Sequence, residues 1–207
     1  MGDLGGTEPI SREFGYDRGT PVDRFYVENF LAARSADIQG RVLEVGDPSY
    51  SNRFGRGITK QDVLHVEDRP GVTLIGDLNE ADSLPENVFD CIVLTQTLHL
   101  IYDMPTAVRT LRASLRPGGV VLVTVPGVSS VDAGEWGTSW FWSLTEHAAK
   151  RLFAAEFGKE KVEVAAYGNV YAATCFLQGL ALEEVDRDSL AVRDPSYPVI
   201  VTVRAVR

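Results

Sequence analysis

The sequence has few of the residues and segments that mark metal-binding, disulfide-bonded or membrane proteins. It holds two cysteines, Cys91 and Cys175, and each lies inside an apolar run, which predicts two buried thiols in a reducing compartment and no disulfide. Paired-cysteine spacings, H-x-x-H pairs and Asp-rich loops do not occur, so no bound metal is predicted. No apolar stretch is long enough to span a bilayer, and the first residues lack a signal-peptide pattern, which favours a cytoplasmic protein.

Positive charge is also scarce in this chain. Its 207 residues include 20 Lys and Arg against 29 Asp and Glu, which gives a formal net charge of −9. A protein of this charge repels phosphate backbones and anionic lipid surfaces. We therefore expect neither nucleic-acid nor membrane partners, and a small or neutral ligand fits the composition better.

Short apolar runs rich in β-branched residues alternate with helical stretches from residue 40 onward. The predicted strands are 42–45, 63–66, 72–75, 91–95, 120–125, 162–167 and 198–206. The predicted helices are 20–36, 103–116 and 145–157, with Thr20 and Asp103 as N-caps. This order predicts an α/β protein with an open, doubly wound, mostly parallel sheet, whose ligand sites lie at the carboxyl ends of the strands.

The chain length fits a single domain, residues 1–207, with two unusual segments. Residues 1–19 are rich in glycine and charge without a sustained period, so they are expected to form an arm laid across the domain. Residues 168–195 are long for a link between two terminal strands, and their apolar residues predict an inserted helix. That insertion fits either a homodimer surface or a lid.

The first predicted strand runs into a sharp turn, GRVLEVGDPSYSNRFG, at residues 40–55. This segment resembles motif I of class I S-adenosylmethionine-dependent methyltransferases, E-x-G-x-G-x-G, with Glu44 and Gly46 at the first acidic and first glycine positions. Gly46 would let the backbone approach a ligand closely, and Glu44 would act on the ammonium end of the cofactor. The remaining glycines are replaced, beginning with Asp47-Pro48; Asp47 is an alternative for the acidic role, and an ordinary Asp-Pro turn is the simpler interpretation.

Acidic residues also follow the next two predicted strands. Glu67 comes about twenty residues after the Gly46 turn, the spacing at which a carboxylate reaches ribose hydroxyls, and Asp68 is the competing choice. Asp77 ends the third strand and resembles the family's adenine-binding acid, although it also fits a solvated capping residue. Leu78 and Thr95 are assigned to the cofactor site by the same resemblance.

The most specific resemblance lies in the combination of an FD-strand, residues 89–101, with a later L-x-P-G-G-strand, residues 111–127. These segments are similar to the methyltransferase motifs that follow motif I. The resemblance implies a seven-stranded Rossmann-like sheet with an antiparallel last strand, S-adenosyl-L-methionine as cofactor, a cofactor-binding core at 40–127 and an acceptor-side half at 128–207. A nicotinamide enzyme would normally carry G-x-G-x-x-G at the first turn, and this chain has none.

A narrower resemblance covers residues 18–31, the WGTSWFW segment at 136–142 and the Tyr167-Gly168-Asn169 tripeptide. These segments look similar to methyltransferase domains found beside bacterial glycosyltransferases in surface-polysaccharide assembly. In that setting the acceptor is a hydroxyl on a sugar, a glycan or a glycosylated small molecule.

Methylation of a hydroxyl calls for one general base within hydrogen-bond reach, and several side chains are candidates. His99 follows the fourth predicted strand, His147 opens a helix, and Glu135 and Asp132 are acidic alternatives in a loop. His99 also fits a buried core histidine, and the loop acids also fit solvated side chains. His65, inside a strand, is predicted to be structural.

The acceptor is expected to lie among aromatic side chains, because aromatic faces stack on the apolar side of sugar rings. The predicted substrate-binding residues are Trp136, Trp140, Tyr26 and Arg24. Two other functions remain open. One is a non-catalytic methyltransferase-fold module that supports a partner enzyme, and the other is an enzyme of secondary metabolism with this fold that does not methylate.

Overall fold

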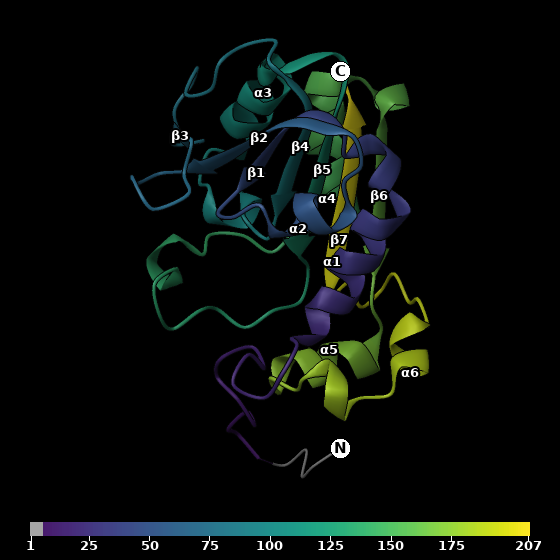
Figure 1. Cartoon of the computed structure of the whole chain (residues 1–207). Helices are drawn as coiled ribbons and strands as arrows, with labels where there is room; N and C mark the ends of the chain where they lie inside the picture. The colour runs from purple at the N-terminus through teal and green to yellow at the C-terminus, as the bar shows by residue number, and fades with distance from the viewer. Residues whose placement is uncertain (1–5) are drawn as a thin grey trace.

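The computed structural model describes residues 6–207 and contains one seven-stranded sheet (Figure 1). The strand order is β3-β2-β1-β4-β5-β7-β6. β1 to β5 are parallel, and β7 is antiparallel to both β5 and β6. The strands are β1 (Gly40–Val45), β2 (Ile58–His65), β3 (Leu74–Ile75), β4 (Phe89–Thr95), β5 (Leu115–Pro126), β6 (Val162–Tyr167) and β7 (Ile200–Val206). The predicted mostly parallel sheet with an antiparallel last strand is confirmed.

Helices cover both faces of the sheet. α1 (Val22–Ala33) and α2 (Ser49–Phe54) pack on one face, and α3 (Met104–Ser114) and α4 (Glu146–Phe157) pack on the other. Because β4 and β5 lie between these two layers, they are apolar and buried on both faces. Single turns of 3₁₀ helix lie at Ser35–Asp37, Leu98–Leu100, Gly137–Ser139, Lys159–Lys161 and Leu182–Glu184.

The helix ends test the predicted capping residues. Asp103 caps α3 by accepting from the backbone N–H of Thr106, as predicted. Thr20 is not the cap of α1, which begins at Val22 after Pro21 and ends at Ala33. The Thr20 hydroxyl donates instead to Glu183 Oε1 at 2.9 Å, a carboxylate of the insertion that lies beside it.

Four strands start earlier than the sequence predicts: β1 and β4 by two residues, and β2 and β5 by five. β2 begins at Ile58 and includes the polar residues Thr59 to Gln61, which carry no apolar signal. β5 begins at Leu115, so α3 stops at Ser114 and not at Arg116. The amino-terminal ends of these strands are linked by charged side chains instead of apolar ones.

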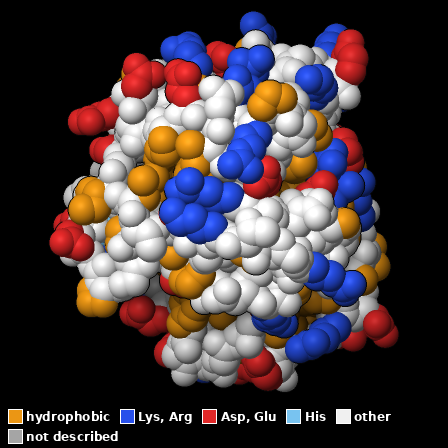
Figure 2. Space-filling view, turned by 45° about the horizontal axis from the view of Figure 1, so that its top comes forward, with side chains coloured by type: hydrophobic (Ala, Val, Ile, Leu, Met, Phe, Trp, Pro, Cys, Tyr) orange, Lys and Arg blue, Asp and Glu red, His pale blue; other side chains and the backbone are white. Residues whose placement is uncertain are grey.

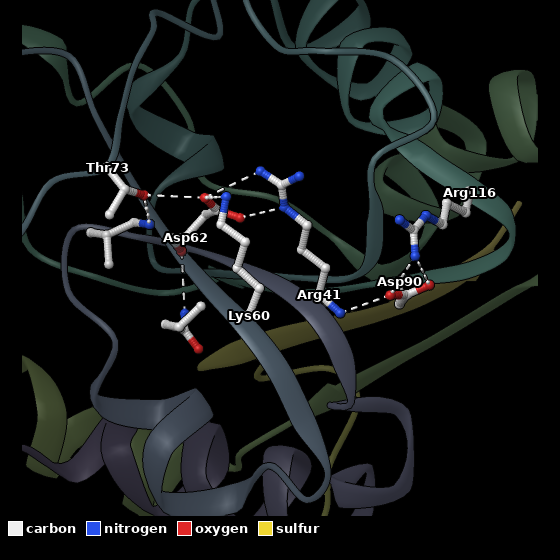
Figure 3. A network of polar contacts seen from close by, with 8 residues as sticks. Arg41, Lys60, Asp62, Thr73, Asp90 and Arg116 are labelled. Carbon is white, nitrogen blue, oxygen red and sulfur yellow. Dashed lines mark hydrogen bonds and ion pairs between the residues drawn. The ribbon is translucent and has the colours of Figure 1, made fainter.

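Figure 3 shows this charged network at the amino-terminal ends of the strands. Arg41 on β1 donates from Nε to Asp62 Oδ2 on β2 at 2.6 Å, and from its backbone N–H to Asp90 on β4 at 2.7 Å. Arg116 on β5 donates to the same Asp90 carboxylate at 3.0 Å. Ion pairs therefore join β1 to β2 and β4 to β5, and a backbone-to-carboxylate hydrogen bond joins β1 to β4.

The insertion and the arm form a separate layer below the carboxyl ends of the parallel strands (Figure 1). The insertion contains α5 (Val170–Leu177) and α6 (Arg187–Ala191). The arm docks on it, because the Ser11 N–H donates to the Gln178 carbonyl at 3.0 Å and Arg18 Nε donates to Glu184 at 2.9 Å. The first five residues of the predicted arm lie outside the described part of the chain.

Both cysteines are buried and unpaired, as predicted, and burial raises the pKa of each thiol. Of the helices between residues 6 and 207, none has the length and apolar character needed to cross a bilayer.

Candidate active site

A cavity of about 590 Å³ opens at the carboxyl ends of β1 to β4. Its floor comes from residues that end these strands, including Val45, His65 and Gln96. Its roof comes from the arm and the start of α1, and one side comes from the loop between β5 and α4. This is the edge at which an open α/β sheet holds its ligands, since the strand order reverses between β1 and β4.

Gly46 leaves the turn after β1 open. Its φ is +90°, a conformation that side-chain-bearing residues rarely adopt, and a Cβ added there would meet no atom within 4 Å. Neither Pro48 nor Tyr50 lines the cavity, and the Tyr50 ring stacks on Phe54 with 6.2 Å between their centroids. The altered motif I therefore leaves the hollow beneath it free.

Glu44 points away from the cavity, into the start of α2. It is 2% exposed, and its carboxylate accepts from the backbone N–H groups of Tyr50 at 3.0 Å and Ser51 at 2.8 Å, and also from the Ser51 hydroxyl. Burial raises its pKa against these hydrogen bonds, which lower it. Asp47 likewise does not line the cavity, and it accepts from the Ser49 N–H at 2.8 Å.

Asp77, the predicted adenine-binding acid, and Leu78, a predicted cofactor-binding residue, both line the cavity. Asp77 Oδ1 accepts from the backbone and side-chain amides of Asn79 at 2.8 and 2.9 Å, as in a capping turn. Glu67 and Thr95 are not among the lining residues. The exposed Glu67 carboxylate pairs with Arg69 at 2.8 Å, and its chain neighbours His65 and Val66 line the cavity instead.

His99 lines the cavity from the 3₁₀ turn that follows β4. It is 1% exposed, and neither ring nitrogen has a hydrogen-bond partner within residues 6–207. Burial lowers its pKa to about 4, so the imidazole is neutral at pH 7. The ring contacts Trp140 edge-on, with centroids 4.4 Å apart, and Phe14 of the arm stacks on the same Trp140 at 5.7 Å.

The other predicted acceptor-side residues divide into two groups. Trp136, which is 39% exposed, and Arg24 line the cavity together with Trp140. Tyr26, His147 and Glu135 do not.

These three side chains have other surroundings. The Tyr26 hydroxyl donates to the Leu190 carbonyl at 2.9 Å, and the residue lines a second cavity between α1 and β6. His147 is exposed on the first turn of α4. Glu135 pairs with Arg69 at 3.0 Å, outside the cavity lining.

The sequence did not single out several residues that line the cavity, among them Phe14, Asp23 and Gln96. Gln96 has a φ of +47°, a strained conformation for a residue with a side chain, and its position directly after β4 was the available signal. Phe14 and Asp23 enter through the docked arm and the start of α1, and no local pattern marks them. Across residues 6–207, no three His, Cys, Asp or Glu side chains gather in a way that would hold a metal ion.

Comparison with known proteins agrees with this architecture. A family model described as a methyltransferase domain matches residues 7–201. No curated protein matches the chain.

Solved structures with the same fold include enzymes of different chemistry. The [4+2]-cyclase SpnF is 17% identical, with 92% of this chain and 83% of that one covered and a TM-score of 0.58. The N-methyltransferase NodS from Bradyrhizobium japonicum, in complex with S-adenosyl-L-homocysteine, is 15% identical, with 96% of each chain covered and a TM-score of 0.55. A possible histamine N-methyltransferase from Thermotoga maritima is 18% identical, covering 95% of this chain and 98% of that one with a TM-score of 0.56.

Proposed function

Since this chain belongs to the methyltransferase domain family, we propose that it moves a methyl group from S-adenosylmethionine to a hydroxyl of a sugar, a glycan or a glycosylated small molecule. In this proposal residues 1–207 act as a single cytoplasmic domain. The resemblance to methyltransferases found beside glycosyltransferases supports a role in bacterial surface-polysaccharide assembly.

The cavity fits this cofactor. Its volume of about 590 Å³ lies within the range of small-molecule and cofactor sites. Gly46 leaves the backbone after β1 open to close approach, and Asp77 and Leu78 offer a carboxylate and an apolar side chain for the purine. When bound, S-adenosylmethionine supplies a methyl group that is already electrophilic because it is attached to a sulfonium.

The chain's own residues would position the acceptor and manage its proton. His99 is neutral at pH 7, so one ring nitrogen is able to accept a hydrogen bond from the acceptor hydroxyl and to take its proton as the oxygen gains the methyl group. Trp136 lines the same cavity and offers an apolar face for a sugar ring. Because the pKa of His99 is low, positioning of the hydroxyl contributes more to the rate than the basicity of the imidazole does.

One observation carries the proposal: His99 is buried in the wall of the cavity with two ring nitrogens that lack a partner in the described chain. Buried polar atoms are nearly always hydrogen-bonded, and those left without a partner mark places where a ligand or an ordered water binds. Of the other predicted bases, Glu135 and His147 lie outside the cavity lining. Asp132 lines the cavity, but its carboxylate already accepts from the Trp136 N–H at 2.8 Å.

The test combines acceptor screening with a matched pair of variants. The purified protein is incubated with S-adenosylmethionine and a panel of methyl glycosides and nucleotide sugars, and products are read by mass for the gain of one methyl group. We expect His99→Gln to lower kcat by about 100-fold or more while S-adenosylhomocysteine affinity is unchanged. His147→Gln, a change at the exposed histidine, should leave both kcat and the affinity for S-adenosylhomocysteine unchanged. Equal turnover by His99→Gln and wild type would remove His99 from this role.

A second candidate function is an enzyme of the same fold that does not methylate. The cyclase SpnF, which has the same fold, supports this second candidate, although the likeness concerns the fold alone. An acceptor consumed without any gain in mass would support this candidate. Binding of both S-adenosylmethionine and S-adenosylhomocysteine with no turnover of any acceptor would instead support a non-catalytic module that serves a partner enzyme.

A further inference from the structure

Asp23 and Arg24, consecutive residues in the first turn of α1, bring opposite charges to the wall of the cavity. Arg24 Nη1 donates to Asp23 Oδ2 at 3.0 Å. Asp23 is 6% exposed, so its carboxylate lies almost entirely out of solvent. The apolar residues Val27, Phe30 and Leu31 pack α1 on the sheet without either side chain.

The Asp23 carboxylate is only half satisfied. Arg24 binds Oδ2, whereas Oδ1 has no hydrogen-bond partner in residues 6–207. Burial raises the pKa of Asp23, and the charge of Arg24 opposes that rise. A buried carboxylate oxygen without a donor is costly, so the wall of the cavity is built to receive a donor at this point.

Arg24 also retains hydrogen-bonding capacity toward the cavity. Its hydrogen bonds within the described chain go to Asp23 and, from Nη2, to the Tyr16 hydroxyl of the arm. A guanidinium has five N–H donors in a planar fork that suits a carboxylate. Asp23 and Arg24 line the same cavity as Val45 and Gly46, which form the end of β1 and the turn after it.

The acid expected to face the cofactor's ammonium group is unavailable. Both oxygens of Glu44 are occupied by the start of α2, and Glu44 does not line the cavity. The free amino acid end of S-adenosylmethionine carries one ammonium and one carboxylate. A buried acid and an adjacent arginine are the complement of that pair of charges.

We propose that Asp23 and Arg24 bind the amino acid end of S-adenosylmethionine, with Asp23 Oδ1 accepting from the ammonium group and Arg24 donating to the carboxylate. This inference rests on the proposed function for its cofactor. The sequence predicts that Arg24 binds the acceptor. The proposed contact assigns it to the cofactor instead. The altered glycine turn is then compensated by the start of α1.

The test compares two ligands that differ only at this end. S-adenosylhomocysteine carries the amino acid, and 5′-methylthioadenosine keeps the adenosyl group and the thioether without it. By titration calorimetry, Asp23→Asn and Arg24→Gln should each weaken S-adenosylhomocysteine about 10- to 100-fold. Affinity for 5′-methylthioadenosine should change less than about 2-fold, because the adenosyl contacts are untouched.

Two singly charged analogues assign the individual contacts. With an S-adenosylhomocysteine analogue that lacks the amino group, Asp23→Asn should cause no further loss, while Arg24→Gln still weakens binding. With an analogue that lacks the carboxylate, the order reverses. The control variants Glu28→Gln and Arg34→Gln, at charged residues of α1 and its end that do not line the cavity, should leave every affinity unchanged.

Three outcomes separate the alternatives. An equal loss for both ligands would mean that the pair only maintains the fold, and unchanged S-adenosylhomocysteine affinity would mean that it serves another ligand; either result overturns the inference. Circular dichroism and thermal melting of each variant establish that it is folded. Failure of the wild-type protein to bind either ligand would instead remove the proposed function itself.

Discussion

His99 shows how burial sets the chemistry of one residue. Its imidazole is 1% exposed, and burial lowers its pKa from 6.5 to about 4. The unfolded chain binds a proton at His99 near pH 6.5, whereas the folded protein resists protonation until about pH 4. The stability that depends on a neutral His99 is therefore present above pH 6.5 and is lost as the pH falls toward 4.

This linkage gives a prediction for stability that does not depend on the acceptor. Between pH 7.5 and pH 5.5, protonation of His99 in the unfolded state should lower the free energy of unfolding of the wild type by about 1 kcal/mol. In His99→Gln that contribution disappears, so the decrease measured by urea unfolding should be smaller by about this amount. His147→Gln, changed at an exposed histidine, serves as the control. An identical pH dependence in wild type and His99→Gln would contradict the buried, neutral state.

At the scale of elements, the arm gives the cavity its roof. Phe14 has a φ of +55° and Gly15 a φ of +95°, so the chain turns sharply there before α1. A Cβ on Gly15 would lie 2.7 Å from the Leu180 carbonyl oxygen, because the turn packs against the segment that follows α5 in the insertion. Ion pairing with Arg18 lowers the pKa of Glu184 to about 2, so this contact stays charged at neutral pH.

Gly15→Ala should therefore release the arm from the insertion. Cleavage by trypsin after Arg12 and Arg18 should become several-fold faster, and affinity for S-adenosylhomocysteine should fall because part of the cavity roof is displaced. Gly158→Ala is the matched control: Gly158 has a φ of +88°, but its Cβ would meet no atom within 4 Å. It should cost about 1 kcal/mol of backbone strain and leave cleavage and binding unchanged. Equal cleavage of the two variants would show that the arm does not depend on this contact.

The elements also show what a sequence can and cannot predict. β4, α3 and α4 were predictable, because strong apolar patterns and capping residues mark them locally. α2 was not, since it is short and its start is held by Glu44 on the preceding strand. The carboxyl-end location of the site follows from strand order, but Phe14 reaches it only because the arm docks on residues more than 160 positions away in the chain.

At the scale of the whole molecule, the two ends of the sheet have different tasks. The end opposite the cavity comes forward in Figure 2, where basic and acidic side chains lie among one another without a large area of one charge. Beneath this face Asp62, with 4% of its side chain exposed, is held by Arg41 and Lys60. Burial opposes ionisation of Asp62, but the hydrogen bonds and charges of these two residues outweigh it and lower its pKa.

This separation predicts that Asp62→Asn affects stability and not binding. Loss of the charge leaves Arg41 without its ion-pair partner on β2, so the free energy of unfolding at pH 7 should fall by about 1–3 kcal/mol. Because the folded pKa is depressed, the difference from wild type should shrink as the pH falls below about 4. Urea unfolding measures the free energy of unfolding. Calorimetry measures the dissociation constant of S-adenosylhomocysteine, which should be unchanged.

Two further variants complete this experiment. Asp68→Asn, at an exposed carboxylate, should change the free energy of unfolding by less than about 0.5 kcal/mol. Asp77→Asn should have the reverse profile of Asp62→Asn, because Asp77 lines the cavity: affinity for S-adenosylhomocysteine should fall about 10-fold with little loss of stability. If Asp62→Asn weakened the ligand as much as Asp77→Asn does, the network at the amino-terminal ends would be coupled to the cavity, and the two ends of the sheet would not act independently.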